Sequence, residues 1–324
     1  MAIPSRIVTV SLNPAIDQTA LVPNFTAGTV NRVDREQADA GGKAVNVASF
    51  LAHFGLRVAV TGLLGDANAE PFVRLFADRG IEDRFVRVAG HTRVNVKIVD
   101  AAQDRVTDIN FPGLAPRPAD LERLVAAVDG LCDGTHWFVL SGSVPAGVPE
   151  GIYADLVRRL KARGKRVLLD ASGPPFAAAM ASAPDVVKPN VEELRELLGR
   201  ALETEAEVLA GARELVARGI GLVAVSMGPD GALFVERDAA VLAVPPRTAV
   251  RSTVGAGDAM VAGIVTATLR GLDLAGRARL ATAFSLGALG EIGPNLPPRE
   301  VVEAYTDRVR VRVVSSEWSG SVSR

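Results

Sequence analysis

Cysteine and histidine are scarce in this sequence. Among its 324 residues there is one cysteine, Cys132, and there are three histidines. A single thiol cannot form an internal disulfide, and too few sulfur and imidazole ligands are present for a zinc site of the usual kinds. A chain without a disulfide framework suits a reducing compartment, so we expect a cytoplasmic protein.

Neither sign of charge is in excess, and long apolar runs are absent. Lys and Arg together number 36 against 37 Asp and Glu, which gives a formal net charge of −1. No broad basic field is therefore available to recruit nucleic acid or an anionic membrane. The sequence has no uncharged apolar stretch long enough to span a bilayer and no apolar signal region near Met1, so we expect neither a membrane span nor a secretory signal.

Short apolar runs alternate with amphipathic helical patterns along most of the chain. The apolar runs are Val58–Leu64, Trp137–Leu140, Val167–Leu169, Val186–Val187 and Leu222–Val225. Because such runs separated by helical segments are typical of βαβ units, the pattern predicts an α/β fold with a mostly parallel sheet. Residues 257–289 predict two further helices, the second of them capped by Asp273.

Two segments, residues 13–40 and 91–113, depart from this alternation. The first has strand-like pieces and no convincing helix, and the second has two alternating stretches around a turn, as in a half-buried hairpin. We interpret both as strands of a small accessory sheet that acts as a lid on a single domain formed by residues 1–324. The Ser-rich residues 315–324 are expected to form a disordered tail.

A glycine-rich turn at residues 252–258 leads into an apolar helix. Gly255 and Gly257 let the backbone approach a ligand closely, and a helix N-terminus presents unpaired N–H groups and the positive end of its dipole. The turn therefore predicts an anion site, with Asp258 beside it as a general base, a role that contributes about 10²–10⁴-fold to a rate. A carboxylate in a first helical turn is also an ordinary helix cap, so this alternative stays open.

Four further stretches place glycines or polar residues at the ends of predicted strands and helices. They are Gly41-Gly42-Lys43 with Asn46, Ser141-Gly142, Lys188 to Glu193, and Ser226 with Gly228 and Gly231. Each stretch has a purely structural alternative, which for Asn190 and Glu193 is a capping box and for Lys43 a side chain that reaches solvent. Ser141 and Gly142 would lie at the carboxyl end of a strand, where open α/β sheets bind ligands.

In their order along the chain these motifs resemble those of the pfkB sugar kinases. The motifs are Asn13–Asp17, Gly41–Asn46, Ser141–Gly147, Lys188–Glu193, Ser226–Gly231 and Thr253–Asp258, and the resemblance covers residues 6–310. It implies a ribokinase-like fold, with three α/β/α layers, a mostly parallel central sheet and a small β-sheet lid over a sugar site. It also implies phosphoryl transfer from ATP with Mg²⁺ as the metal ion.

Within that family the lid segments resemble those of bacterial 1-phosphofructokinases, through Thr92–Lys97 and above all through Thr107–Gly113. This resemblance implies phosphorylation of fructose 1-phosphate at its 6-hydroxyl. Tagatose-6-phosphate kinases and 6-phosphofructokinases of the same family are near alternatives, and a non-catalytic sugar-phosphate sensor is a more distant one.

Two details bear on recognition of a phosphorylated sugar. Alternation places Arg93, Asn95 and Lys97 on one face of a lid strand, and such a basic face suits a phosphosugar better than a free sugar. The chain departs from the family at Ala44, where glycine is usual, which bears on how Lys43 is presented to the substrate.

Carried over by position, the resemblance implies a role for each matching residue. Asp258 is the base that deprotonates the sugar hydroxyl. The residues implied for the anion hole are Gly255, Ala256 and Gly257, through their backbone N–H groups. The residues implied for the sugar phosphate are Asp17, Gly41, Gly42, Lys43, Asn46, Arg93, Asn95, Ser141 and Gly142. The residues implied for ATP are Lys188, Asn190, Ser226, Gly228, Gly231, Thr253 and Ser285.

The metal ion and the oligomeric state complete these expectations. Asn190 and Glu193 match the motif that organises Mg²⁺, largely through water. The lid strands have edges that need covering, so a homodimer through the lid is expected.

Overall fold

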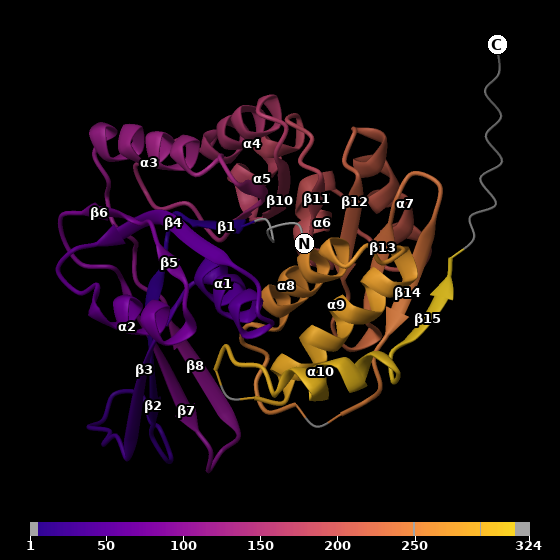
Figure 1. Ribbon diagram of the computed structural model, residues 1–324. Coiled ribbons are helices and arrows are strands. Elements are labelled where there is room, and N and C mark those ends of the chain that lie inside the picture. Colours follow the sequence, from indigo (N-terminus) through magenta and orange to yellow (C-terminus); the bar gives the residue numbers. More distant parts are fainter. Residues whose placement is uncertain (1–5, 249, 292, 315–324) are drawn as a thin grey trace.

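The computed structural model describes residues 6–248, 250–291 and 293–314. A large sheet of eleven strands runs through its centre with helices on both faces, and a sheet of four strands projects from one end (Figure 1). This confirms the α/β fold and the small separate sheet that the sequence pattern predicts, and the three α/β/α layers that the resemblance implies. The tail expected at residues 315–324 lies outside the described residues.

The central sheet is mostly parallel. Its strands, in spatial order, are β15 (Arg310–Val313), β14 (Ala240–Val244), β13 (Ala232–Val235), β12 (Leu222–Ser226), β11 (Val186–Val187), β10 (Arg166–Asp170), β9 (Thr135–Ser141), β1 (Arg6–Ser11), β4 (Val58–Gly65) and β5 (Glu82–Asp83), and β6 (Val86–Val88) pairs with β4. The strands from β12 to β5 pair in parallel, and β13, β14 and β15 extend the sheet antiparallel. The carboxyl ends of the parallel strands therefore lie along one edge, where α/β sheets bind ligands.

Helices bury the two faces of this sheet in two separate apolar clusters. The helices of one cluster are α1 (Lys43–His53), α2 (Glu70–Arg79), α8 (Ala256–Leu269), α9 (Leu274–Leu289) and α10 (Arg299–Thr306). The helices of the other are α3 (Pro118–Gly130), α4 (Ile152–Ala162), α5 (Gly173–Met180), α6 (Val191–Leu198) and α7 (Glu205–Ala217), and a short 3₁₀ helix spans Gly228–Asp230. In the part of the chain that is described, no helix has the length and apolarity that a bilayer crossing requires.

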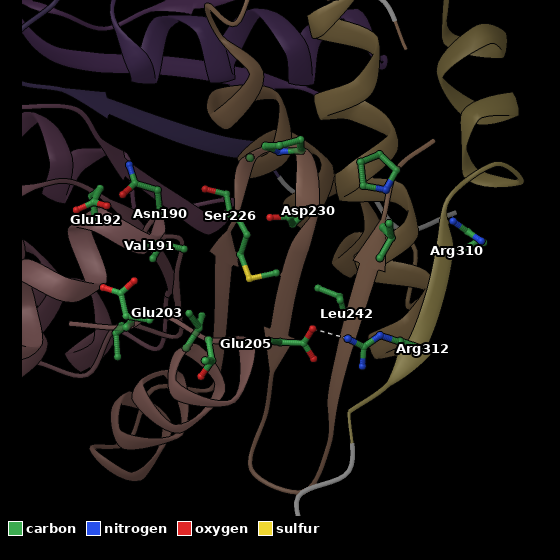
Figure 2. Close-up of a pocket in the computed structure, with 18 of the residues that line it drawn as sticks. Asn190, Val191, Glu192, Glu203, Glu205, Ser226, Asp230, Leu242, Arg310 and Arg312 are labelled. Carbon is green, nitrogen blue, oxygen red and sulfur yellow. Dashed lines mark hydrogen bonds and ion pairs between the residues drawn. The ribbon is translucent and has the colours of Figure 1, made fainter. Parts of the chain in front are cut away.

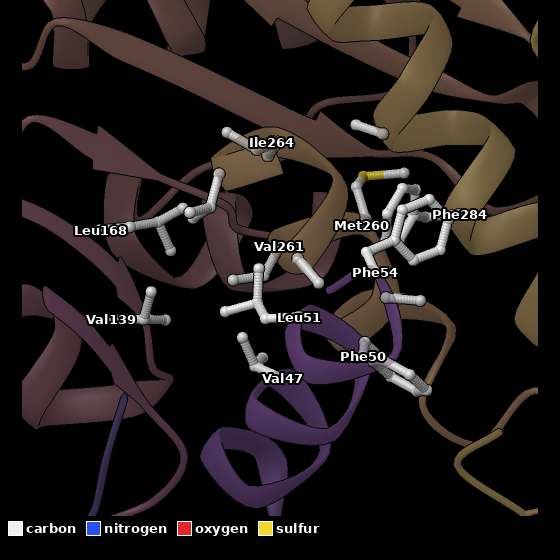
Figure 3. Packing of buried hydrophobic residues seen from close by; sticks show 14 of the residues in the cluster. Val47, Phe50, Leu51, Phe54, Val139, Leu168, Met260, Val261, Ile264 and Phe284 are labelled. Carbon is white, nitrogen blue, oxygen red and sulfur yellow. The ribbon is translucent and has the colours of Figure 1, made fainter. Parts of the chain in front are cut away.

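Helices α1 and α8 pack directly against each other and against the sheet (Figure 3). Val47 and Leu51 on α1 face Val261 on α8, and all three are fully buried. Phe54, just beyond α1, packs against Phe284 of α9, with the two rings tilted by 35° and their centroids 4.1 Å apart. Burying each such side chain stabilises the fold by about 1.5–3 kcal/mol. This packing holds the first turns of α1 and α8, which carry Asn46 and Asp258, side by side.

The break that the sequence predicts between the last long helices is confirmed. Helix α8 ends at Leu269, and α9 begins at Leu274. Asp273 is the N-cap, since its carboxylate accepts a hydrogen bond from the backbone N–H of Gly276 at 2.8 Å. Capping of this kind satisfies a donor that the helix itself cannot.

The four-stranded sheet is formed by the two segments that depart from the α/β alternation. Its strands, in spatial order, are β3 (Arg35–Gly41), β2 (Ala15–Leu21), β7 (Val94–Asp100) and β8 (Arg105–Ile109). Asp17 on β2 pairs in register with Asn95 on β7, so these two side chains lie on the same face. That face looks onto the carboxyl edge of the central sheet, because both residues line a cavity there.

Candidate active site

A cavity of about 470 Å³ lies between the lid and the carboxyl edge of the central sheet. Its walls come from four places: the lid, the first turn of α1, the ends of β10 to β12, and the turn before α8. The residues that line it are Ala15, Asp17, Gly42, Lys43, Asn46, Arg93, Asn95, Asp170, Lys188, Asn190, Glu193, Ser226, Val254, Gly255, Gly257 and Asp258. Most of the residues that the sequence predicts for catalysis and sugar binding are thus brought together in one cavity.

Asp258 lies in the first turn of α8 and is buried, with 6% of its surface exposed. The turn before it needs glycine, because Gly255 has a φ of 80°. The Asp258 carboxylate accepts a hydrogen bond at 2.8 Å from the amide of Asn46, which lies in the neighbouring helix α1. The carboxylate is therefore bonded across to another helix and faces the cavity, which favours a chemical role over simple capping.

Burial raises the pKa of Asp258 to about 7, and repulsion from the nearby Asp170 acts in the same direction. The hydrogen bond from Asn46 and the charges of Lys43 and Lys188 oppose this rise. A carboxyl group with a pKa near neutrality is suited to accept a proton and release it again.

Asp170 is a site residue that sequence reasoning missed. It ends strand β10 and is 1% exposed, and its carboxylate lies 3.5 Å from the ammonium of Lys43 and 3.4 Å from that of Lys188. Burial alone would raise the pKa of Asp170, but attraction to Lys188 and Lys43 outweighs burial and holds the pKa below its ordinary value. The same attraction raises the pKa of Lys43. The available signal was its position directly after the apolar run Val167–Leu169.

The three predicted donors of the anion hole are placed differently. Gly255 and Gly257 line the cavity, whereas the backbone N–H of Ala256 points to the carbonyl oxygen of Thr253 at 3.4 Å. At that distance the bond is weak. A bulkier residue at position 257 would meet Lys188, since an added Cβ would lie 3.5 Å from its ammonium nitrogen. The glycine turn and Lys188 therefore converge on the same space.

The lid contributes one carboxylate, one amide and one guanidinium to the cavity. The amide of Asn95 donates to the Asp17 carboxylate at 3.0 Å. Burial raises the pKa of Asp17, although Asn95 and the charges of Arg93 and Lys97 oppose it. Gly41 leaves room for Asp17, because an added Cβ would lie 2.5 Å from the Asp17 carboxylate oxygen and would displace it. This group of polar side chains can accept and donate hydrogen bonds to sugar hydroxyls.

Lys97 does not share the position of Arg93 and Asn95. It lies further along β7 and forms an ion pair with Asp108 of β8 at 3.3 Å, as their register predicts. Lys97 does not line the cavity, whereas Arg93 and Asn95 do. Arg93 is therefore the cation that the lid presents to the cavity.

Asn190 and Glu193 form the capping box that the sequence allows as their structural alternative. The Asn190 side chain accepts from the backbone N–H of Glu193 at 2.8 Å, and the Glu193 carboxylate accepts from the backbone N–H of Asn190 at 2.9 Å. The other Glu193 oxygen lies 3.9 Å from the Lys43 ammonium. Both residues still line the cavity, so the cap also orients them towards its interior.

The donor set fits Mg²⁺ held through water and phosphates. Within the described residues no group of three or more His, Cys, Asp or Glu side chains could enclose a metal ion. One oxygen of Asp170 is buried without a hydrogen bond, although the ammonium groups of Lys43 and Lys188 lie 3.5 and 3.4 Å from it, and Glu193 adds a second carboxylate. Mg²⁺ commonly keeps several waters and takes one or two carboxylates together with substrate phosphates, so such a set is sufficient.

A larger cavity of about 920 Å³ adjoins the first and shares Asn190 and Ser226 with it. Figure 2 shows these two residues on one side and Leu242, Arg310 and Arg312 on the other. Gly228, one of the residues predicted for ATP, also lines this cavity. The two cavities therefore meet at Asn190, which follows β11, and at Ser226, which ends β12.

Several predicted residues line neither cavity. They are Gly41, Ser141, Gly142, Ala256, Gly231, Thr253 and Ser285. Ser141 is fully buried and its hydroxyl donates to Asp170 at 3.3 Å, so it supports the site from beneath. The carbonyl of Gly142 accepts from the Tyr153 hydroxyl, and Gly231 packs against the backbone of Ala243. Thr253 is exposed and Ser285 is half-buried on α9.

Ala44, the departure from the family pattern, is fully buried in the first turn of α1. Its methyl group is part of the apolar interior, and the neighbouring Lys43 still reaches Asp170 and Glu193. The substitution therefore leaves Lys43 directed into the site.

Comparison with known proteins agrees with this geometry. The family model for pfkB family carbohydrate kinases matches residues 6–300. The chain is 57% identical over 310 residues to a 1-phosphofructokinase of Rhodobacter capsulatus, covering 95% of this chain and 98% of that protein. Two solved structures of phosphofructokinase-2 from Escherichia coli, one in complex with fructose-6-phosphate and one a tetrameric inhibited form, each have a TM-score of 0.87 and 29% identity, covering 94% of this chain and 98% of theirs. The chain therefore belongs to the pfkB family of carbohydrate kinases.

Proposed function

We propose that this chain transfers the γ-phosphoryl group of ATP to the 6-hydroxyl of fructose 1-phosphate, giving fructose 1,6-bisphosphate and ADP. The observation that carries the proposal is a buried carboxylate, Asp258, beside a glycine turn in the same cavity as three cations, Lys43, Lys188 and Arg93. The high identity to a protein named 1-phosphofructokinase supports fructose 1-phosphate as the sugar.

Asp258 is proposed as the general base. It accepts the proton of the 6-hydroxyl as the oxygen attacks the γ-phosphorus, the bond to the ADP oxygen breaks, and ADP leaves with the charge. The Asn46 amide fixes one oxygen of the carboxylate at 2.8 Å. Little covalent chemistry is required of the protein, so positioning and stabilisation of charge supply most of the rate.

The negative charge of the transferring group is proposed to lie between the α8 turn and two lysines. Backbone N–H groups at the start of α8 and the ammonium groups of Lys43 and Lys188 all border the same cavity. Removing one donor of this kind commonly costs about 10²–10³-fold in kcat. Lys188 is 5% exposed, so its charge acts with little screening by water.

The sugar phosphate is proposed to lie under the lid. Asp17 and Asn95 would bind its hydroxyls and Arg93 its existing phosphate. The backbone of Gly42, whose φ of 102° favours glycine, borders the same space. On the nucleotide side, Asn190, Ser226 and Gly228 border the groove. Lid closure over this space excludes water, which limits wasteful hydrolysis of ATP.

Asn190 and Glu193 are proposed to hold Mg²⁺ through water molecules, with Asp170 close by. When bound, the ion would neutralise negative charge on the phosphate groups. The lysine pair and the helix N-terminus supply further positive charge from the protein itself.

The substrate is tested by measuring kcat/KM for fructose 1-phosphate, fructose 6-phosphate and tagatose 6-phosphate with MgATP. We expect fructose 1-phosphate to be preferred and the turnover to disappear when the metal ion is chelated. A preference for either 6-phosphate would favour the related kinases of the family, one of which has been solved in complex with fructose-6-phosphate. Sugar binding without any turnover would indicate a sensor.

Residues 1–324 are proposed to form a single domain, with lid segments at 13–40 and 91–113, located in the cytoplasm. Two copies of this domain are proposed to form a homodimer through the lid. The lid face that carries Asp17 and Asn95 continues outward with Leu21 and Val106, which are 37% and 58% exposed. All five residues of strand β8 are exposed. A second lid would cover this apolar surface and the open edge of the sheet.

The change Val106→Asp tests this assembly. A carboxylate placed in an apolar contact would be buried without a partner, so we expect the dimer to dissociate in light scattering at micromolar concentration. Val313→Asp is the matched control, because Val313 is 76% exposed on the edge strand β15, at the opposite end of the molecule from the lid (Figure 1). A wild-type chain that scatters as a monomer would contradict the proposal.

A further inference from the structure

The chain passes between the lid and the body of the protein at four places, and all four lie at or against Asn13 and Pro14. These two residues themselves lead from β1 into β2. The other crossings pass through Gly42 at the start of α1, Arg93 before β7 and Gly113 after β8. Each of these three residues contacts Asn13 or Pro14 directly.

Arg93 is held by the backbone of this pair. Its guanidinium donates to the carbonyl oxygen of Asn13 at 3.1 Å and to that of Pro14 at 3.3 Å. Bonds from a charged donor are stronger than neutral ones and directional. The direction in which Arg93 enters the cavity is therefore fixed by where the Asn13 and Pro14 carbonyl groups lie.

The side chain of Asn13 fixes the same backbone from the other side. Its amide nitrogen donates to the hydroxyl of Ser143, in the loop after β9, at 3.0 Å. Gly113 lies against its oxygen so closely that an added Cβ would be 2.1 Å away. An added Cβ at Gly42 would lie 2.9 Å from the Cα of Pro14. The Asn13 amide thus joins the body loop to the end of the lid.

We propose that Asn13 is a positioning residue for the sugar phosphate. By tying Ser143 of the body to the base of the lid, it sets the position of Arg93 and the angle at which the lid covers the cavity. The inference rests on the proposed function, because it takes the ligand of Arg93 to be the phosphate group of the sugar. It predicts that disturbing Asn13 impairs use of the sugar phosphate and leaves use of ATP nearly intact.

The change Gly113→Ala tests the role without removing any polar group. The new methyl group would displace the Asn13 amide, whose oxygen lies 2.1 Å from the added Cβ, and would also touch the Pro145 ring, where a shift of a few tenths of an ångström suffices. A misplacement of about 1 Å can cost on the order of 10²-fold in rate. We expect the KM for fructose 1-phosphate to rise by about 10–100-fold while the KM for ATP changes less than about twofold. Gly130→Ala is the control, since Gly130 ends helix α3 and an added Cβ there meets nothing within 4 Å.

The change Asn13→Ala supplies the second arm. Asn13→Ala should also raise the KM for fructose 1-phosphate. Adding Gly113→Ala to Asn13→Ala should have little further effect, because the amide that the new methyl group displaces is already gone. Additive effects of the two changes, or equal increases in the KM for ATP, would overturn the inference. So would thermal destabilisation of Gly113→Ala with both KM values unchanged.

The wild-type protein separates this inference from the function on which it rests. Absence of any turnover of fructose 1-phosphate by the wild type would refute the proposed function. An active wild type whose KM for fructose 1-phosphate is insensitive to Gly113→Ala would refute the positioning role alone.

Discussion

Replacing Asp258 by asparagine should lower kcat by about 10²–10⁴-fold while the chain stays folded. The amide keeps the size of the carboxylate and can still accept the hydrogen bond from Asn46, so the geometry of α1 and α8 is preserved. It cannot accept the proton of the sugar hydroxyl. Steady-state assay of D258N with MgATP and fructose 1-phosphate measures the loss.

The matched control is Asp273→Asn. Asp273 also begins a helix, and asparagine caps helices as well as aspartate does, so activity should be unchanged. If phosphorylation by D258N stays within about tenfold of the wild type, then Asp258 is not the base.

The raised pKa of Asp258 gives the same prediction a pH dependence. Since the pKa of this carboxyl in the free protein is about 7, kcat/KM should fall about tenfold per pH unit below neutrality, as the base becomes protonated. A rate that stays flat down to pH 5 would contradict the assignment. The D258N variant should lack this acid limb in its residual activity.

The contribution of Asp258 to the stability of the fold should depend on pH in the opposite direction to its contribution to activity. A carboxyl whose pKa is higher in the folded than in the unfolded chain stabilises the fold at low pH, and this contribution is lost as pH rises towards about 7. At pH 8 the wild type therefore carries a buried carboxylate that burial and Asp170 disfavour. D258N should melt at a higher temperature than the wild type at pH 8, and the difference should shrink at pH 5.

The sequence predicts the local structure around Asp258 well, because glycine and aspartate favour particular positions at the start of a helix. Gly255 is the N-cap of α8, and Gly257 and Asp258 lie in its first turn, so this arrangement can be interpreted without knowing what packs on it. Asn46 is 212 positions away from Asp258, and only the resemblance to the pfkB kinases relates the two residues before the fold is known. The strands and helices around them follow from periodicity, which burial on one face imposes.

The carboxyl ends of the strands are less predictable. Ser141 and Asp170 are paired in register at the ends of β9 and β10, yet sequence alone does not say which of them faces the ligand. Ser141 is the one that the sequence singles out, and it lies beneath the cavity, bonded to Asp170. A single aspartate after an apolar run is common, so its importance emerges only when Lys43 and Lys188 are seen on either side.

Asp170→Asn should therefore be among the most damaging single changes in the chain. The Asp170 carboxylate is the ion-pair partner of Lys188, and both groups are almost fully buried. Removing one partner of a buried pair leaves an uncompensated charge, which commonly costs about 3–5 kcal/mol in the free energy of unfolding. Lys43 is less affected, because it is more exposed and also faces Glu193 at 3.9 Å. Denaturant unfolding at pH 7 measures the loss.

Asp129→Asn is the matched control, since Asp129 also pairs with two cations, Arg159 and Arg163, but at the surface. Exposed pairs contribute about 0–1 kcal/mol, so this variant should be close to the wild type. Equal losses in the two variants would show that the buried position of Asp170 is not what matters.

The pH dependence of Asp170→Asn distinguishes a role in catalysis from one in folding alone. The pKa of Asp170 is lower in the folded protein than in the unfolded chain. Its carboxylate therefore stabilises the fold above the pKa of the unfolded chain, and this effect is lost as pH falls through the pKa of the folded protein. The wild type and Asp170→Asn should thus have similar free energies of unfolding at strongly acid pH. The Asp170 charge also helps to raise the pKa of Asp258. Removing this charge should shift the acid side of the kcat/KM profile to lower pH. If the profile does not shift, Asp170 positions the two lysines but does not change the pKa of Asp258.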